Sequence, residues 1–185
     1  MSLQQKSELI TDELTRAMLQ IDNTQAEAFV QELLSARRVL VVGVGRVLIS
    51  LKAWVKRMLH LGIDINVVGS ETERPIFEGD MLIVASSSGE SAVPKTIAAI
   101  AKEKGAHVAY IGCTANSTIA QMADSRLLLA GRTKYALPGE FASAQPMSTL
   151  FEQQLYLLGD AIALMVMEQK GLSEADVKSS HANLE

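Results

Sequence analysis

Four serines and a glycine lie close together in the stretch Ser86-Ser87-Ser88-Gly89-Glu90-Ser91. The apolar run 81–85 before it predicts a buried strand, and the run 93–101 after it predicts a helix that Ser91 caps. Serine hydroxyls, the unpaired N–H groups of a helix N-terminus and the helix dipole all favour a bound anion. The candidate ligands of a phosphate group are Ser86, Ser87, Ser88, Gly89 and Ser91. The alternative is an ordinary strand-to-helix turn with a serine cap.

A second candidate binding segment, Gly43-Val44-Gly45-Arg46, follows the run 39–42, which predicts a parallel strand. Gly45 would let the backbone turn sharply and approach a ligand closely. A dinucleotide fingerprint would need a third glycine near position 48, and Leu48 there argues against nicotinamide binding. Arg46 lies where open α/β sheets bind ligands, so its guanidinium is a candidate for holding a phosphate or a sugar oxygen. A surface arginine is the alternative.

Two further side chains have the chemistry to move protons. Glu152 sits in the second turn of a helix predicted to begin at Pro146, between Phe151 and an apolar stretch. A carboxylate beside apolar surface can act as a general base, and the alternative is an acid that only compensates the helix dipole. His60 ends the helix predicted over 48–60, and it is either a catalytic histidine or a cation placed favourably at a helix end.

The chain has 185 residues, of which 48% are hydrophobic, and its net charge is −4. An acidic chain argues against nucleic acid as the main partner, because a phosphate backbone demands a basic face. The single cysteine, Cys113, cannot form an internal disulfide, and no cysteine–histidine cluster predicts a zinc site. The N-terminus lacks an apolar signal core and no apolar run reaches the length of a membrane helix. We therefore expect a cytoplasmic protein with no membrane partner.

Strand and helix patterns alternate along the chain, which predicts one α/β domain over residues 1–185, a three-layer αβα sandwich around a parallel sheet. Further helices are predicted over about 3–36 and about 146–181. The stretch from Leu155 to Met167 is apolar almost all round, and a helix of that kind is buried on all sides. We therefore expect the terminal helices to pack at subunit interfaces, with Leu158 and Met165 facing a neighbouring chain.

A set of longer motifs runs through the chain. They are Gly43-Val44-Gly45-Arg46, Lys56-Arg57-Met58-Leu59-His60-Leu61-Gly62, the Ser86 to Ser91 turn, Pro146-Met147-Ser148-Thr149-Leu150-Phe151-Glu152-Gln153 and His181-Ala182-Asn183-Leu184-Glu185. With these motifs the chain resembles the sugar isomerase (SIS) domain family over nearly its whole length. The serine turn identifies the broad family, and the last two motifs point to its 6-phospho-3-hexuloisomerase branch.

The resemblance implies a flavodoxin-like fold with a five-stranded parallel sheet and assembly as a homotetramer. It also implies the isomerase step of the ribulose monophosphate pathway, in which 3-hexulose 6-phosphate and fructose 6-phosphate interconvert through a cis-enediol without a metal or organic cofactor. By similarity, the serine turn holds the phosphate, Glu152 moves the carbon-bound proton, and His181 reaches the site of a neighbouring subunit. A carboxylate and a histidine suit these roles, because a second group must move a proton between the two substrate oxygens.

The chain departs from the family pattern at several positions near the proposed pocket. Val47 and Leu48 stand where the family commonly has serine and glycine, and Ser87 stands where glycine is usual. Glu73 and Arg74 stand where threonine and proline are common. Two alternatives therefore stay open. One is a non-catalytic SIS module that binds a sugar phosphate as a sensor, and the other is an isomerase of a different sugar phosphate.

Overall fold

The computed structural model describes residues 1–183, so Leu184 and Glu185 of the terminal motif lie outside the described residues. Five parallel strands form one sheet in the order β2-β1-β3-β4-β5. The strands are β1 (Val39–Val42), β2 (Ile65–Val67), β3 (Met81–Ala85), β4 (His107–Gly112) and β5 (Ser125–Leu128). This is the strand order of flavodoxin-like folds, so the predicted fold class is confirmed.

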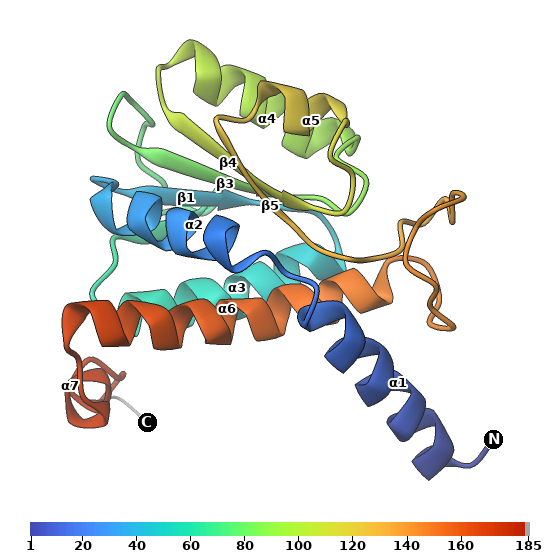
Figure 1. The fold of residues 1–185 in the computed structure, drawn as a ribbon. Helices are drawn as coiled ribbons and strands as arrows, with labels where there is room; N and C mark the ends of the chain where they lie inside the picture. The colour runs from blue at the N-terminus through green and yellow to red at the C-terminus, as the bar shows by residue number, and fades with distance from the viewer. Residues whose placement is uncertain (184–185) are drawn as a thin grey trace.

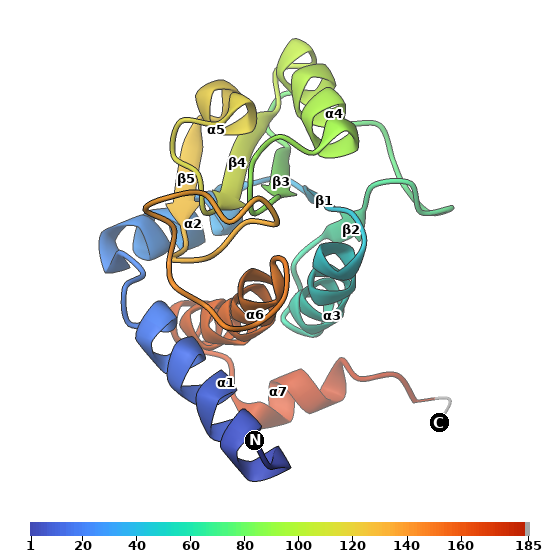
Figure 2. The same ribbon diagram turned by 90° about the vertical axis from the view of Figure 1, so that its right-hand side faces the viewer.

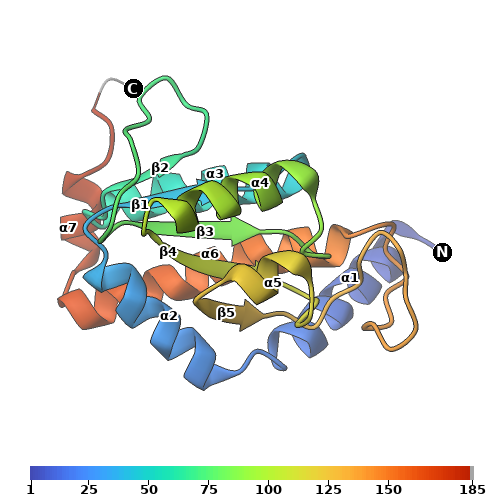
Figure 3. The same cartoon turned by 90° about the horizontal axis from the view of Figure 1, so that it is seen from above.

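Helices cover both faces of the sheet and complete the three predicted layers (Figure 1). The helices are α1 (Leu3–Met18), α2 (Asn23–Ser35), α3 (Arg46–His60), α4 (Ala92–Glu103), α5 (Thr118–Met122), α6 (Thr149–Lys170) and α7 (Glu174–Ser179). α4 and α5 lie on one face, and α2, α3 and α6 lie on the other, as Figure 2 shows end-on. From above, α1 and the loop of residues 129–148 extend past the end of the sheet toward which the strand arrows point (Figure 3).

The core explains why the central strands read as unbroken apolar runs. Every residue of β1 and β3 is buried, because helices cover both faces. Successive side chains of a strand point to opposite faces. Val39 and Val41 therefore join the hydrophobic cluster formed with α2, α3 and α6, whereas Leu40 and Val42 join the cluster formed with α4 and α5.

Two helices begin at residues other than those predicted. α3 begins at Arg46 rather than at residue 48, because Gly45 (φ 59°, ψ −134°) takes a conformation that is readily open only to glycine and turns the chain straight into the helix. α6 begins at Thr149 rather than at Pro146, because Met147 has a φ of 55° and keeps the chain in a turn. Both differences lie beside candidate site residues.

α6 is the longest helix within residues 1–183 and is apolar along much of its length. It has 22 residues and a mean hydropathy of 1.2 in its most apolar window, so by length and composition it is long enough to cross a membrane. The expectation that no apolar run reaches membrane-spanning length therefore does not hold for this window by length and composition alone. Half of that window is buried inside the fold, where α6 packs against α1, α2 and α3. This burial is typical of the core helix of a globular domain.

The two sides of α6 differ in their surroundings. Leu158 is 3% exposed within its own chain and Met165 packs partly against the same core, so the prediction that Leu158 faces a neighbouring chain is wrong. The outward side carries Tyr156, Leu157 and Leu164, which are 49%, 42% and 66% exposed. An apolar side of α6 therefore lies uncovered within the single chain.

The direction of winding reverses between β1 and β3, and this reversal positions the candidate site. The two strands are neighbours in the sheet, with Val42 paired to Val84, yet the chain leaves β1 for α3 on one face and β3 for α4 on the other. Open α/β sheets bind ligands in the crevice at such a switch point. The segment 43–46 and the Ser86–Ser91 turn both start there, as the sequence predicts.

Candidate active site

The serine turn is held mainly by its own hydroxyl groups. The Ser86 hydroxyl lies 3.1 Å from that of Ser91 and accepts a hydrogen bond of 3.2 Å from the Gly89 N–H. The Ser88 hydroxyl accepts one of 3.3 Å from the Glu90 N–H. Ser91 is the N-cap residue of α4, but its side chain makes no capping bond, so the predicted serine cap is wrong in that detail. The first N–H groups of α4 thus remain without a side-chain acceptor at a helix N-terminus, which suits an anion.

Tyr110 and Ser117 lie against the serine turn and fix its shape. The phenol of Tyr110 is fully buried and donates a hydrogen bond of 2.9 Å to the Ser86 carbonyl, and burial raises the pKa of Tyr110 to about 12. Gly89 has a φ of +64°, and a Cβ there would lie 1.9 Å from the Ser117 hydroxyl oxygen. Only glycine fits that position. Tyr110 was not among the predicted site residues, although a tyrosine inside an otherwise aliphatic strand is a usable signal.

The turn is also tied to the neighbouring helix α5. The Glu90 carboxylate accepts hydrogen bonds of 2.6 Å from the Thr118 N–H and 2.8 Å from the Thr118 hydroxyl. These bonds, first the backbone one and then the side-chain one, lower the pKa of Glu90. Glu90 therefore holds the serine turn in place, and it was not among the predicted site residues.

Arg46 and Glu152 meet at the N-termini of α3 and α6. Arg46 Nε donates to Glu152 Oε2, and the Ser148 hydroxyl donates to Glu152 Oε1 at 3.1 Å. The Ser50 hydroxyl donates to the Glu152 carbonyl at 2.8 Å, so the α6 backbone is anchored as well. The Glu152 side chain is 11% exposed and that of Arg46 is 65% exposed. The arrangement places a mostly covered carboxylate beside an accessible cation at the ligand-binding edge of the sheet.

Val47 lies in the core rather than on the surface of the site. It is 8% exposed, belongs to the cluster with α3 and α6, and would contact a Cβ placed on Gly43 at 3.0 Å. The departure from the family serine therefore fills space beneath the first turn of α3. Gly43 must be small at this point, because the same Cβ would also lie 2.9 Å from Leu51.

His60 and His181 lie together, far from the Glu152 of the same chain. Their rings are 5.2 Å apart between centroids. α3 separates His60 from Arg46 by about 21 Å at 1.5 Å per residue. His60 is 8% exposed, and within residues 1–183 neither of its ring nitrogens has a hydrogen-bond partner. Burial, followed by the charges of Lys56, His181 and Arg57, lowers the pKa of His60. The structure does not bring these predicted site residues to their own chain's carboxylate.

No group of three or more histidine, cysteine, aspartate or glutamate side chains within residues 1–183 is arranged to hold a metal ion. Cys113 lies at the end of β4 as a free thiol, and burial raises its pKa to about 12. The thiol is therefore protonated at neutral pH and is a poor metal ligand or nucleophile.

The fold and the switch-point turn define a doubly wound α/β domain. The chain belongs to the SIS domain family, whose family model matches residues 32–158. A Bacillus subtilis protein named 3-hexulose-6-phosphate isomerase is 35% identical over 95% of each chain. A protein of the same name from Methylomonas aminofaciens is 31% identical and covers 96% of this chain and 97% of its own.

A solved structure agrees in fold. It is a Methanococcus jannaschii protein with an inferred molecular function of 3-hexulose-6-phosphate isomerase, and it matches with a TM-score of 0.83 and 22% identity. The match covers 98% of this chain and 99% of the other. The predicted family and its hexuloisomerase branch are confirmed by the sequence relatives, and so is the predicted class, a phosphosugar isomerase.

Proposed function

We propose that this chain interconverts 3-hexulose 6-phosphate and fructose 6-phosphate by proton transfer through a cis-enediol. The observation that carries the proposal is the Glu152 carboxylate, which is mostly covered and is held by Ser148 and Arg46 at the switch point of the sheet. The names of the sequence relatives supply the substrate.

The proposed reaction moves the carbonyl from C3 to C2 with no net change in composition. Glu152 removes the proton from C2, and the resulting electron pair forms the C2–C3 double bond of the enediol as O3 gains a proton. Glu152 then returns its proton to C3, while O2 loses its own proton and becomes the carbonyl oxygen. One carboxylate can carry out both proton transfers at carbon, the removal from C2 and the return to C3. A second group must carry the proton between O2 and O3.

The phosphate binds, in this proposal, at the Ser86–Ser91 turn. Its hydroxyl groups and the N-terminal N–H groups of α4 are the donors. Arg46 would exchange its contact with Glu152 for a substrate oxygen, which would leave the carboxylate free to take the carbon proton. Gly45 contributes to the site through its backbone conformation, because that conformation starts α3 at Arg46.

The second proton carrier is proposed to be the partner subunit's His181. Within one chain α6 puts about 27 Å between Glu152 and Lys170, and α7 follows beyond Lys170. His181 and its neighbour His60 can therefore contribute to an active site only if that site belongs to another subunit. The uncovered apolar side of α6 supports such an assembly, which we take to be a homotetramer.

The test is to incubate the protein with 3-hexulose 6-phosphate in D₂O and follow the products by NMR. We expect fructose 6-phosphate to form, with solvent deuterium incorporated at the carbon that receives the proton. No isomerisation of any phosphohexulose, combined with retained sugar-phosphate binding, would overturn the proposal in favour of a sensor module.

Ligand binding is tested separately by thermal unfolding. Fructose 6-phosphate should raise the melting temperature, because it binds only the folded state. The double variant Ser86→Ala, Ser88→Ala should lose most of that rise. The control is Ser7→Ala, Ser179→Ala, which removes two exposed hydroxyls on α1 and α7. An equal rise in both double variants would refute the phosphate assignment.

A further inference from the structure

α1 carries a buried carboxylate on a helix that is otherwise mostly exposed. Glu13 is 4% exposed and accepts hydrogen bonds from the 129–148 loop. The donors are the Ser143 hydroxyl at 2.7 Å, the Ala144 N–H at 2.7 Å and the Gln145 side-chain amide at 3.1 Å. Glu13 therefore forms hydrogen bonds with three consecutive residues of a loop that lies 130 positions further along the chain.

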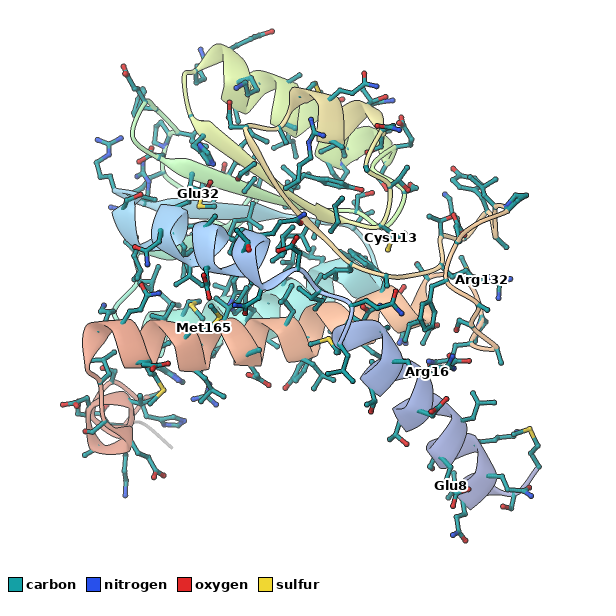
Figure 4. The ribbon with its side chains drawn as sticks, viewed as in Figure 1. Glu8, Arg16, Glu32, Cys113, Arg132 and Met165 are labelled. Carbon is teal, nitrogen blue, oxygen red and sulfur yellow. The ribbon has the colours of Figure 1, made fainter. Side chains whose placement is uncertain are left out.

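The same loop segment is held from a second direction. Arg132 donates from Nη1 to the carbonyls of Ser143 and Gln145, at 3.0 and 3.3 Å. Arg16, one turn after Glu13 on α1, also stacks over the Phe141 ring at 5.5 Å. Figure 4 shows Arg16 on the part of α1 nearest the loop and Glu8 on the part that stands away from it. Residues 143–145 are thus clamped between α1 and the start of the loop.

The clamped segment leads directly to the candidate base. Pro146 and Met147 form the turn that follows, and both the N–H and the hydroxyl of Thr149 bond to the Pro146 carbonyl, at 3.2 and 2.7 Å. Ser148 comes next and donates to the Glu152 carboxylate. No flexible linker separates the clamp from Glu152, so a shift of residues 143–145 would be passed to Ser148 and to the first turn of α6.

We propose that Glu13 is a positioning residue for the isomerase reaction, because it fixes the segment that sets the place of Ser148 and Glu152. The inference rests on the proposed function, and it gives α1 a role in the site that no motif of the chain marks. A base that is misplaced by about 1 Å loses a large part of its rate advantage.

The charge state of Glu13 supports the clamp. Burial alone would raise the pKa of Glu13, but the hydrogen bonds from Ala144, Ser143 and Gln145 and the nearby Arg16 charge hold that pKa below its usual range. The carboxylate is therefore ionised near neutral pH and can accept from all its donors. A glutamine at position 13 would direct its side-chain NH₂ group, itself a donor, at these donors, so at least one of the hydrogen bonds would be lost.

The test compares Glu13→Gln with Glu8→Gln, which changes the charge of the same helix at an exposed position. We expect Glu13→Gln to lower kcat about tenfold, with KM for the phosphosugar within twofold of wild type, since the serine turn is separate from the clamp. Glu8→Gln should match wild type. Glu13→Asp should recover part of kcat. Unchanged kcat in folded Glu13→Gln, or equal losses in kcat and substrate binding, would overturn the proposal.

Hydrogen–deuterium exchange supplies a readout that needs no activity. The peptide 143–152 should exchange faster in Glu13→Gln than in Glu8→Gln, and unchanged exchange would overturn the proposal. If the wild type is inactive, the proposed function fails, while the exchange result still decides whether Glu13 fixes this segment. Should Glu13→Gln not fold, Ser143→Ala removes one donor alone and should give smaller changes in the same direction in both kcat and exchange.

Discussion

Arg46 Nε donates to Glu152 Oε2, and this contact joins the first residue of α3 to the fourth residue of α6. The two residues are 106 positions apart in sequence, yet each was singled out on its own chemistry. Because the Arg46 side chain is far more exposed than that of Glu152, a ligand reaches the cation first. Under the proposed function, substrate binding to Arg46 would release Glu152 to act as the base.

The first prediction concerns this carboxylate. Glu152→Gln keeps the size and the hydrogen bond to Ser148 but removes the basic oxygen. We expect kcat to fall about a hundredfold or more, within the usual contribution of a positioned general base, while KM changes little. Steady-state kinetics on the confirmed substrate measure both constants. Glu168→Gln, on the exposed far part of α6, is the control, and a wild-type rate for Glu152→Gln would refute the role of the base.

The second prediction concerns the support of the phosphate turn. Tyr110→Phe removes the hydroxyl that donates to the Ser86 carbonyl and leaves the ring in the core. We expect the variant to lose about 1 kcal/mol of unfolding free energy, since one buried hydrogen bond is lost. Its affinity for inorganic phosphate should also fall, measured by calorimetry. Tyr135→Phe removes an exposed hydroxyl from the 129–148 loop and should change neither quantity. Equal behaviour of the two variants would show that Tyr110 does not shape the turn.

The third prediction concerns assembly. Leu164→Asp puts a charge on the uncovered side of α6, where Leu164 is 66% exposed within its own chain, so each chain should stay folded while the oligomer dissociates. Analytical ultracentrifugation should show smaller species with unchanged far-UV circular dichroism.

Leu158→Asp provides the contrast, because Leu158 lies in its own core and the variant should unfold. A wild type that sediments as a monomer at micromolar concentration would end the interface hypothesis.

Much of the fold could be predicted because local signals and tertiary packing agree. β1 and β3 are unbroken apolar runs, and the structure buries them on both faces. Ser117 caps α5 by accepting a hydrogen bond from the Ala120 N–H, the role that serine commonly plays at a helix start. Where a backbone conformation decides the boundary, as at Gly45 and Met147, the pattern alone put the helix start two or three residues away.

The candidate site was predictable only in its individual residues. Ser86, Arg46 and Glu152 were found because each lies at a strand end or helix start with matching chemistry. No sequence pattern indicates the hydrogen bonds between Glu13 and the 129–148 loop, since an acid on a polar helix usually faces solvent. The separation of His60 from Glu152 likewise follows from helix direction, which the spacing of residues along the chain does not reveal.

The last prediction concerns the pH dependence of stability through His60. Its pKa in the folded chain lies below the ordinary value of 6.5, first because of burial and then because of the charges of Lys56, His181 and Arg57. The unfolded chain therefore binds more protons than the folded chain between the two pKa values, so the unfolding free energy falls as pH drops below about 6.5. For one proton the slope is at most about 1.4 kcal/mol per pH unit.

His60→Phe removes the titrating group and fills the same buried space, so its loss of stability from pH 7.5 to 5.5 should be smaller than that of wild type. Urea unfolding at fixed protein concentration measures the difference, because assembly also contributes to stability. His181→Gln should keep most of the wild-type dependence, since burial rather than the neighbouring histidine is the main cause of the lowered pKa. Parallel curves for His60→Phe and wild type would show that the pKa of His60 is the same in the folded and unfolded chains, and would refute the predicted pH dependence.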